Sequence, residues 1–167
     1  DMGAASRSVL AWAGLFARVY DAKITVMHAE SLDPPRYFSK SQLESLSARE
    51  KSDLAILHEE LSRLADGALP RGTSREVAVD EGHPVEAILK RVAAEPPDLL
   101  VLGSHGRSRT TRLLLGSVAE NVIREASCPT LVVKETEASP PGVRRVLCPV
   151  NFTDLSLRCM EVASDVT

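Results

Sequence analysis

A spaced set of glycines in the second half of the chain is the feature best suited to chemistry. Gly103 and Gly106 are separated by two residues, and nine residues further on Gly116 is followed by Ser117. Glycine brings the backbone close to a ligand because it carries no side chain. Gly116 and Ser117 open a predicted helix, whose first amides have no intrahelical partner and can bind an anion. The spacing therefore predicts a site for the phosphates of a nucleotide.

Other nucleotide and metal motifs do not occur in the sequence. No lysine precedes Ser117, as a Walker A loop requires, and the dinucleotide spacing GxGxxG is missing. The four histidines and three cysteines lack the spacing of metal ligands, so we expect neither a metal site nor a disulfide framework. Glycines that follow a strand also fit an ordinary turn. The loop arginines, Arg107, Arg109 and Arg112, fit phosphate neutralisation and plain solvation equally well.

Helices and strands alternate along the chain and must position this loop. Apolar spacing predicts helices over residues 6–20, 42–65, 84–92 and 118–125. Strands are expected over 24–27, 76–79, 98–102 and 130–133. This order predicts an α/β fold, a doubly wound, mostly parallel five-stranded sheet with helices on both faces. Ligands bind such sheets at the carboxyl ends of the strands, and the glycine loop follows one of those ends.

Composition excludes several classes of protein. The 167 residues include 20 basic and 23 acidic side chains, giving a net charge of −3, and 44% are hydrophobic. This is a globular composition rather than a disordered one. Without a basic run we expect no nucleic acid or anionic membrane as partner. No apolar stretch reaches the ~18 residues of a membrane span, and no basic signal region opens the chain, so we expect a cytoplasmic protein.

The glycine loop and its flanks resemble the universal stress protein family. The nucleotide motif of that family is glycine, two residues, glycine, nine residues, glycine, then serine or threonine, and every position is met. The flanking segments 99–108, 113–122 and 128–133 are also similar, and the resemblance extends over residues 1–134. It implies a Rossmann-like fold of the adenine nucleotide alpha hydrolase type. It also implies ATP as the ligand, with or without Mg²⁺.

The resemblance implies a role for each matching residue. An acidic residue would lie near the ribose or a phosphate-bound metal, and a backbone position just after segment 24–28 would face the adenine. Two residues would flank the sugar, and four would hold the phosphates. The acidic residue is Asp1, and the residue facing the adenine is Ala29. The residues flanking the sugar are Leu102 and Gly103, and those holding the phosphates are Gly106, Gly116, Ser117 and Val118.

An internal repeat is visible after the polar linker 135–143. At an offset of 150 residues, four positions near the start of the chain fall opposite similar residues near its end: Asp1, Ser6, Leu10 and Ala13 opposite Asn151, Ser156, Met160 and Ala163. We therefore expect a tandem array, with one domain over 1–134 that lacks its first strand and the opening of a second over 144–167. The alternative is a C-terminal hairpin or helical tail.

Two strand-pairing expectations follow from this organisation. The apolar segment 144–150 is predicted to fill the first-strand position between strands 24–27 and 99–102, in its own subunit or swapped from a neighbour. Alternatively, it starts its own domain. The edge strand 130–133 is expected to pair with a second copy or a tandem domain, because an uncovered apolar edge invites pairing.

The favoured function is that of an ATP-binding universal stress protein acting as a nucleotide-responsive stress or regulatory module. The loop offers no obvious carboxylate as a base, so we predict no catalytic residue and at most slow ATP hydrolysis. Two alternatives remain open. One is a nucleotide-free interaction scaffold with the same fold, consistent with Asn151 in place of an acidic residue. The other is a slow ATPase or nucleotidyl-transferring enzyme.

Overall fold

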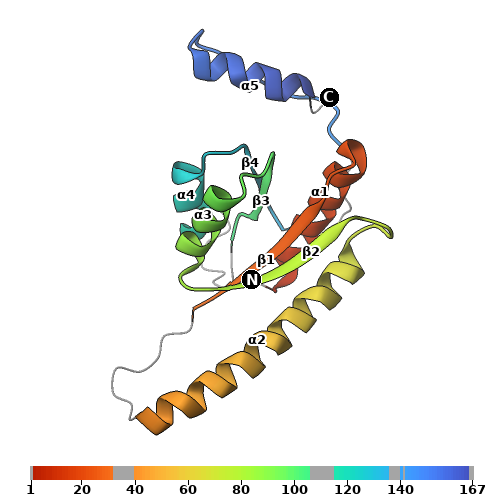
Figure 1. The fold of residues 1–167 in the computed structure, drawn as a ribbon. Coiled ribbons are helices and arrows are strands. Elements are labelled where there is room, and N and C mark those ends of the chain that lie inside the picture. Colours follow the sequence, from red (N-terminus) through yellow and green to blue (C-terminus); the bar gives the residue numbers. More distant parts are fainter. Residues whose placement is uncertain (1, 32–39, 106–114, 136–139, 141, 166–167) are drawn as a thin grey trace.

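Helices and strands alternate through the part of the chain that the computed structural model describes, residues 2–31, 40–105, 115–135, 140 and 142–165 (Figure 1). In order they are α1 (Ala4–Tyr20), β1 (Ile24–Glu30), α2 (Lys40–Ala68), β2 (Arg75–Glu81), α3 (Pro84–Ala94), β3 (Leu100–Gly103), α4 (Ser117–Glu125), β4 (Thr130–Val133) and α5 (Asp154–Asp165). The predicted α/β class is confirmed. The observed β1, β2 and α2 are longer than the apolar spacing indicated.

The described strands form two parallel pairs. β1 pairs with β2 from Ile24 opposite Arg75 to Glu30 opposite Glu81. β3 pairs with β4 over their four residues, and the two pairs are separate sheets. Parallel pairing is as predicted. The single five-stranded sheet stays a prediction, because β1 and β3 are not hydrogen-bonded neighbours in the described part of the chain.

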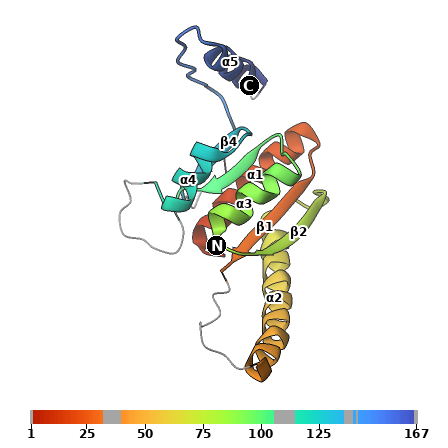
Figure 2. The same cartoon turned by 60° about the vertical axis from the view of Figure 1, so that its left-hand side comes forward.

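The segment 144–150 does not fill the position between β1 and β3. It forms no strand, and its Leu147 side chain is 90% exposed. Two views place α5, which follows it, apart from both sheets (Figures 1 and 2). Insertion within the same subunit is therefore wrong for this structure, because a central strand needs backbone partners on both sides and this segment pairs with no strand of the described chain. A swap between subunits stays a prediction.

The helices cover the strands on two sides. α1 packs against α2, β3 and β4, whereas α3 packs against α4 and β1. Figure 2 shows α1 and α3 on opposite sides of the strands. Between α1, α2 and β1 lies a core cluster that buries five apolar side chains, those of Leu10, Val26, Leu61, Ala65 and Leu69. The helical spacing of the α2 members gives that helix one apolar stripe against the sheet.

Helix α1 crosses the end of α2 at Gly14. A Cβ atom added at Gly14 would lie 2.7 Å from Cδ of Pro70 and 3.4 Å from Cδ2 of Leu69. The proline ring is rigid, so a side chain at position 14 would push the two helices apart. Glycine at this position therefore sets the approach of α1 to α2.

The described helices differ from membrane-spanning helices in length or hydropathy. None of them is both long and apolar enough to cross a membrane. The longest, α2, has 29 residues but carries charged side chains along its length.

An ion pair joins the end of β2 to α3. Arg91 donates from Nε and Nη2 to the two carboxylate oxygens of Asp80, at 2.8 and 2.7 Å. Both side chains are about two-thirds buried. These hydrogen bonds hold the pKa of Asp80 below its ordinary value, and Asp80 in turn raises the pKa of Arg91. The bidentate geometry makes this pair stronger than a typical surface pair.

We expect Leu61→Ala to lower the free energy of unfolding by about 2–5 kcal/mol, because Leu61 is 3% exposed and its removal leaves a cavity in the core cluster. Urea denaturation measures the loss. The matched control is Ile56→Ala on the same helix, which is 52% exposed and should stay within about 0.5 kcal/mol of the parent. Equal losses in the two variants would contradict this core.

We expect the Asp80–Arg91 pair to stabilise the fold at neutral but not at strongly acidic pH. A carboxyl group whose pKa is lower in the folded state contributes stability above its unfolded pKa, about 3.9, and loses it as pH falls through the folded pKa. Asp80→Asn should therefore cost about 1 kcal/mol at pH 7 and almost nothing near pH 2. Urea denaturation at both pH values tests this.

Glu120→Gln is the control for that experiment. Glu120 pairs with Arg124 at 2.8 Å on an exposed helix surface, where solvent screens the interaction, so a smaller change at pH 7 is expected. An Asp80→Asn loss that persists at low pH would show that packing rather than charge is responsible.

Candidate functional site

Backbone hydrogen bonds bring the two halves of the glycine motif together. The Ser104 amide donates to the Val133 carbonyl oxygen at 2.8 Å, and the Gly116 amide donates to the Ser104 carbonyl oxygen at 2.8 Å. Ser104 follows β3, Val133 ends β4 and Gly116 precedes α4. The ends of β3 and β4 and the start of α4 therefore meet at one edge.

The start of α4 is open to an anion. Gly116 is the N-cap residue, with φ −65° and ψ 148°, and it makes no side-chain cap hydrogen bond. The amides of Ser117 and Val118 belong to the first turn, where the helix supplies no acceptor. Ser117 is exposed and Val118 is half-buried. Because the Gly116 amide is already bonded to Ser104, the donors of this turn that have no backbone acceptor within the described part of the chain are the amides of Ser117 and Val118.

The first turns of α1 lie against the end of β3. A Cβ atom added at Gly103 would lie 3.6 Å from Cγ2 of Val9 and 3.9 Å from Cβ of Ala5, both on α1. These are ordinary contact distances, and the backbone of Gly103 is not in a left-handed conformation. The fold itself therefore does not require glycine at position 103.

Of the remaining predicted site residues, one lies in β3, one lies in the other strand pair, and two lie outside the described part of the chain. Ala29 lies near the end of β1, opposite Asp80 in register, and Leu102 is half-buried in β3. β1, β2 and β3 all end on the side of the molecule where α1 begins (Figure 1). Among the described residues, no backbone hydrogen bond joins Ala29 to the β3 loop. Asp1 and Gly106 lie outside the described residues.

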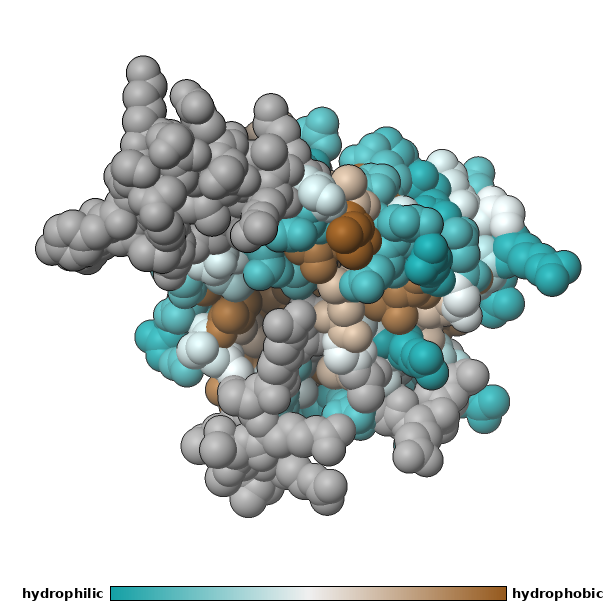
Figure 3. All heavy atoms as spheres, turned by 90° about the horizontal axis from the view of Figure 1, so that it is seen from below, coloured by the Kyte–Doolittle hydropathy of each residue, from teal (hydrophilic) through white to brown (hydrophobic). Residues whose placement is uncertain are grey.

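The face at which these strands end combines apolar and hydrophilic surface. Figure 3 views the molecule from this side and shows brown apolar residues exposed between teal hydrophilic ones. A nucleotide presents both kinds of surface, since its base is largely apolar and its phosphates are charged. The face is therefore suited to such a ligand in its chemistry.

A serine and histidine next to Gly103 were not singled out as ligand-binding residues by the sequence. Ser104 is 4% exposed, and its Oγ lies 3.0 Å from Nδ1 of His105. The other ring nitrogen of His105, Nε2, is buried and has no hydrogen-bond partner within the described residues. The position of His105 inside the motif was the available sequence signal, but burial of one ring nitrogen depends on the tertiary structure.

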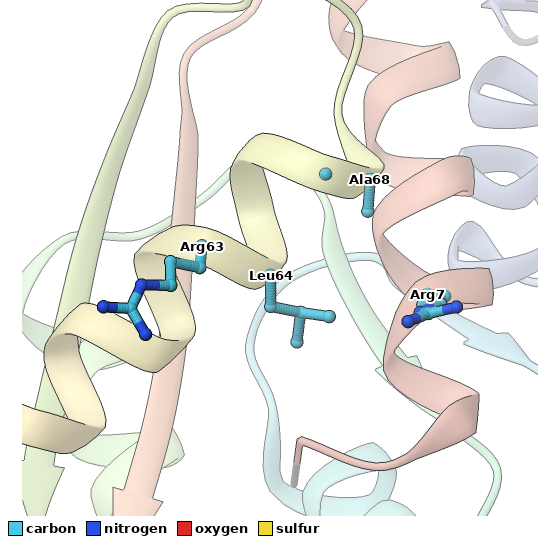
Figure 4. Close-up of a pocket in the computed structure, with 5 residues that line it drawn as sticks. Arg7, Arg63, Leu64 and Ala68 are labelled. Atoms are coloured by element: carbon cyan, nitrogen blue, oxygen red, sulfur yellow. The ribbon is translucent and has the colours of Figure 1, made fainter.

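Two surface pockets lie elsewhere. One, of about 380 Å³, is lined by Arg7 of α1 and by Arg63, Leu64, Gly67 and Ala68 of α2 (Figure 4). Arg63 is 72% exposed and pairs with Glu59 at 2.5 Å, so its charge is already balanced. The other, of about 240 Å³, is lined by residues between Ala65 and Arg75. Neither is lined by a residue of the glycine motif.

Metal and thiol chemistry have little support in the described part of the chain. There, no group of three or more histidine, cysteine, aspartate or glutamate side chains is placed to hold a metal ion. Burial raises the pKa of the Cys128 thiol, which disfavours the reactive thiolate. The three cysteines are free rather than paired in disulfides.

Sequence comparisons relate most of the chain to one protein family. The sequence model of the Universal stress protein family matches residues 1–134. A universal stress protein of Methanocaldococcus jannaschii is 31% identical over 123 residues, which cover 71% of this chain and 69% of the relative. A universal stress protein of Thermus aquaticus is 32% identical over 120 residues, covering 71% of this chain and 82% of the relative.

A solved structure is similar in fold. The crystal structure of a universal stress protein in complex with cAMP matches 81% of this chain and 92% of its own length, with 26% identity and a TM-score of 0.56. The sequence match includes the whole of α1 to β4 and the glycine motif. The chain therefore belongs to the universal stress protein family.

Proposed function

We propose that this chain binds an adenine nucleotide, preferably ATP, and acts as a nucleotide-responsive stress or regulatory module. The observation that carries the proposal is the start of α4, where Gly116 is the N-cap residue and makes no side-chain cap hydrogen bond, tied to the end of β3 by the hydrogen bond from Gly116 to Ser104. Free amides and the positive end of the helix dipole favour a phosphate there. The similar universal stress protein crystallised with cAMP supports an adenine nucleotide as the ligand.

The phosphates are proposed to lie against α4. Ser117 and Val118 would donate their amides, and the exposed Ser117 hydroxyl would add a third donor. Gly116 would contribute space rather than its amide, which is occupied by Ser104. Gly106 joins this group on the family pattern alone.

The sugar and base are proposed to lie along the strand ends. Leu102 and Gly103 end β3 and would flank the sugar, while Ala29 near the end of β1 would present backbone groups to the adenine. Asp1 would lie near the ribose or hold a phosphate-bound Mg²⁺, on the family pattern. Such a metal would neutralise phosphate charge when the nucleotide is bound.

Binding is favoured over turnover. Hydrolysis needs a positioned water and a base close to the terminal phosphate. Among the described residues that flank the loop, 100–105 and 115–119, none is aspartate or glutamate. Glu120, one residue further along α4, accepts a hydrogen bond from Arg124 at 2.8 Å. We therefore assign no catalytic residue and propose at most slow hydrolysis.

The interaction-scaffold alternative has one observation in its favour, which concerns partner binding rather than the absence of a nucleotide. Residues 144–165 expose large apolar side chains, among them Leu147 at 90%, Phe152 at 86% and Leu155 at 73%. α5 begins at Asp154 and α1 at Ala4, so the two helices start at the repeat offset of 150 residues. We propose that 144–167 is the opening unit of a second domain, whose sheet would cover these side chains as β3 covers α1. A partner-binding role of this kind is compatible with nucleotide binding by the first domain.

The outer edge of β4 is the proposed pairing surface for a second copy or a tandem domain. The carbonyl groups of Pro129 and Val133 accept hydrogen bonds from the β3 side. Backbone groups alternate along a strand, so those of Thr130 and Val132 point away from β3. Within the described residues β4 pairs with β3 alone, which leaves this edge available.

We expect Gly116→Val to weaken ATP binding at least tenfold, measured by calorimetric titration, because the added side chain enters the space assigned to the phosphates. The backbone of Gly116 is in the extended region, which valine adopts readily, so the fold should be retained. The control is Gly67→Val in α2, where an added Cβ meets nothing within 4 Å. Unchanged ATP affinity in Gly116→Val would contradict the site.

We expect the parent protein to form dimers that Val132→Pro dissociates, because proline removes an outward-facing amide of the β4 edge. Light scattering with a dilution series measures the dissociation constant. Val132→Thr keeps the amide and is the control. A monomeric parent at high concentration, or a Val132→Pro dimer of unchanged stability, would count against homodimer pairing through β4.

A further inference from the structure

The Ser104–His105 pair leaves one buried nitrogen without a partner. Nδ1 of His105 and Oγ of Ser104 are 3.0 Å apart, while Nε2 of His105 is buried and unpaired within the described residues. A buried polar atom that lacks a partner costs about 1–3 kcal/mol. Native proteins retain such atoms mainly where a ligand, an ion or a water completes them.

The hydrogen-bond network assigns the tautomer of His105. Ser104 is almost fully buried, and the imidazole is the acceptor that the described residues offer to its hydroxyl. If the hydroxyl donates to Nδ1, only one group stays unpaired, the N–H at Nε2. If Nδ1–H donated instead, both the hydroxyl proton and the Nε2 lone pair would be unpaired. The first arrangement is the less costly, so Nε2 carries the proton.

A buried N–H donor calls for an oxygen acceptor, and the backbone of Ser104 indicates which one. Its carbonyl accepts from the Gly116 amide, so the serine that orients His105 is bonded directly to the residue that caps α4. The groups expected beside that helix start are the phosphates of the nucleotide. We propose that His105 is a further binding residue, whose Nε2–H donates to a phosphate oxygen of the bound nucleotide.

This inference rests on the proposed nucleotide function and extends it to a specific donor. It gives Ser104 a role as well: its hydroxyl is a positioning group that fixes the tautomer and the ring. A neutral donor at Nε2 stabilises a phosphate through a hydrogen bond to a charged acceptor, which is stronger than a neutral hydrogen bond. Because His105 is expected to bind the phosphate, it should not contribute to the affinity for adenosine, which has no phosphate.

The test compares AMP, ATP and adenosine by calorimetric titration against the full chain. His105→Ala should weaken AMP and ATP about ten- to hundredfold, the range expected for a lost hydrogen bond to a charged group, and leave adenosine affinity unchanged. His105→Gln, whose amide nitrogen can reach the position of Nε2, should recover most of the affinity. His105→Asn, which reaches only the position of Nδ1, should remain as weak as His105→Ala.

Two further measurements separate binding from folding. Long-range ¹⁵N spectra of the parent should show the proton on Nε2, with a shift of that resonance when AMP is added. Thermal unfolding of each variant reports any loss of structure, and His58→Ala, an exposed histidine of α2, is the matched control.

The outcomes are distinct. Equal AMP affinity in the parent and His105→Ala would overturn the role of His105 while leaving the nucleotide site intact, and would indicate that a water completes Nε2. Equal losses for AMP and adenosine would also overturn it, because the phosphate would not be the group recognised. Failure of the parent itself to bind any of the three would overturn both this inference and the proposed function.

Discussion

The backbone of Ser104 is the point on which the architecture of the candidate site depends. Its amide bonds to the end of β4, and its carbonyl bonds to the residue that caps α4. The two peptide groups that flank the Cα atom of Ser104 therefore hold the β3–β4 pair and the start of α4 in place relative to each other. Both bonds join backbone groups, so the helix start is placed here without a side-chain contact from Ser104.

Helix α1 links this site to the core. Leu10 belongs to the buried cluster with β1 and α2, while Ala5 and Val9, on the first turns, lie against Gly103. Gly14 then lets α1 approach the end of α2 closely. Packing that stabilises the fold therefore also sets one wall of the strand-end region. Ion pairs such as Asp80–Arg91 add to this framework from the other side of the strands.

The C-terminal part of the chain has a different character. α5 starts at the repeat position of α1, but its apolar side chains, unlike those of α1, are not covered by strands. A helix is stabilised in proteins largely by the burial of its apolar face. α5 and the segment before it are therefore the part of the described chain that gains most from a partner surface.

The sequence by itself determined the order of helices and strands, the parallel class of the sheet and the position of the glycine loop at a strand end. These depend on local periodicity and on connection rules, which a single sequence carries. Ser117 and Val118 at an open helix start could be predicted for the same reason. The tertiary structure alone decided that segment 144–150 lies outside the sheet and that the Gly116 amide is taken by Ser104. It also decided that one nitrogen of His105 is buried and finds no partner among the residues that the structure describes. Each of these depends on which groups far apart in the chain come within hydrogen-bond distance or exclude water, and residue type and spacing do not encode that.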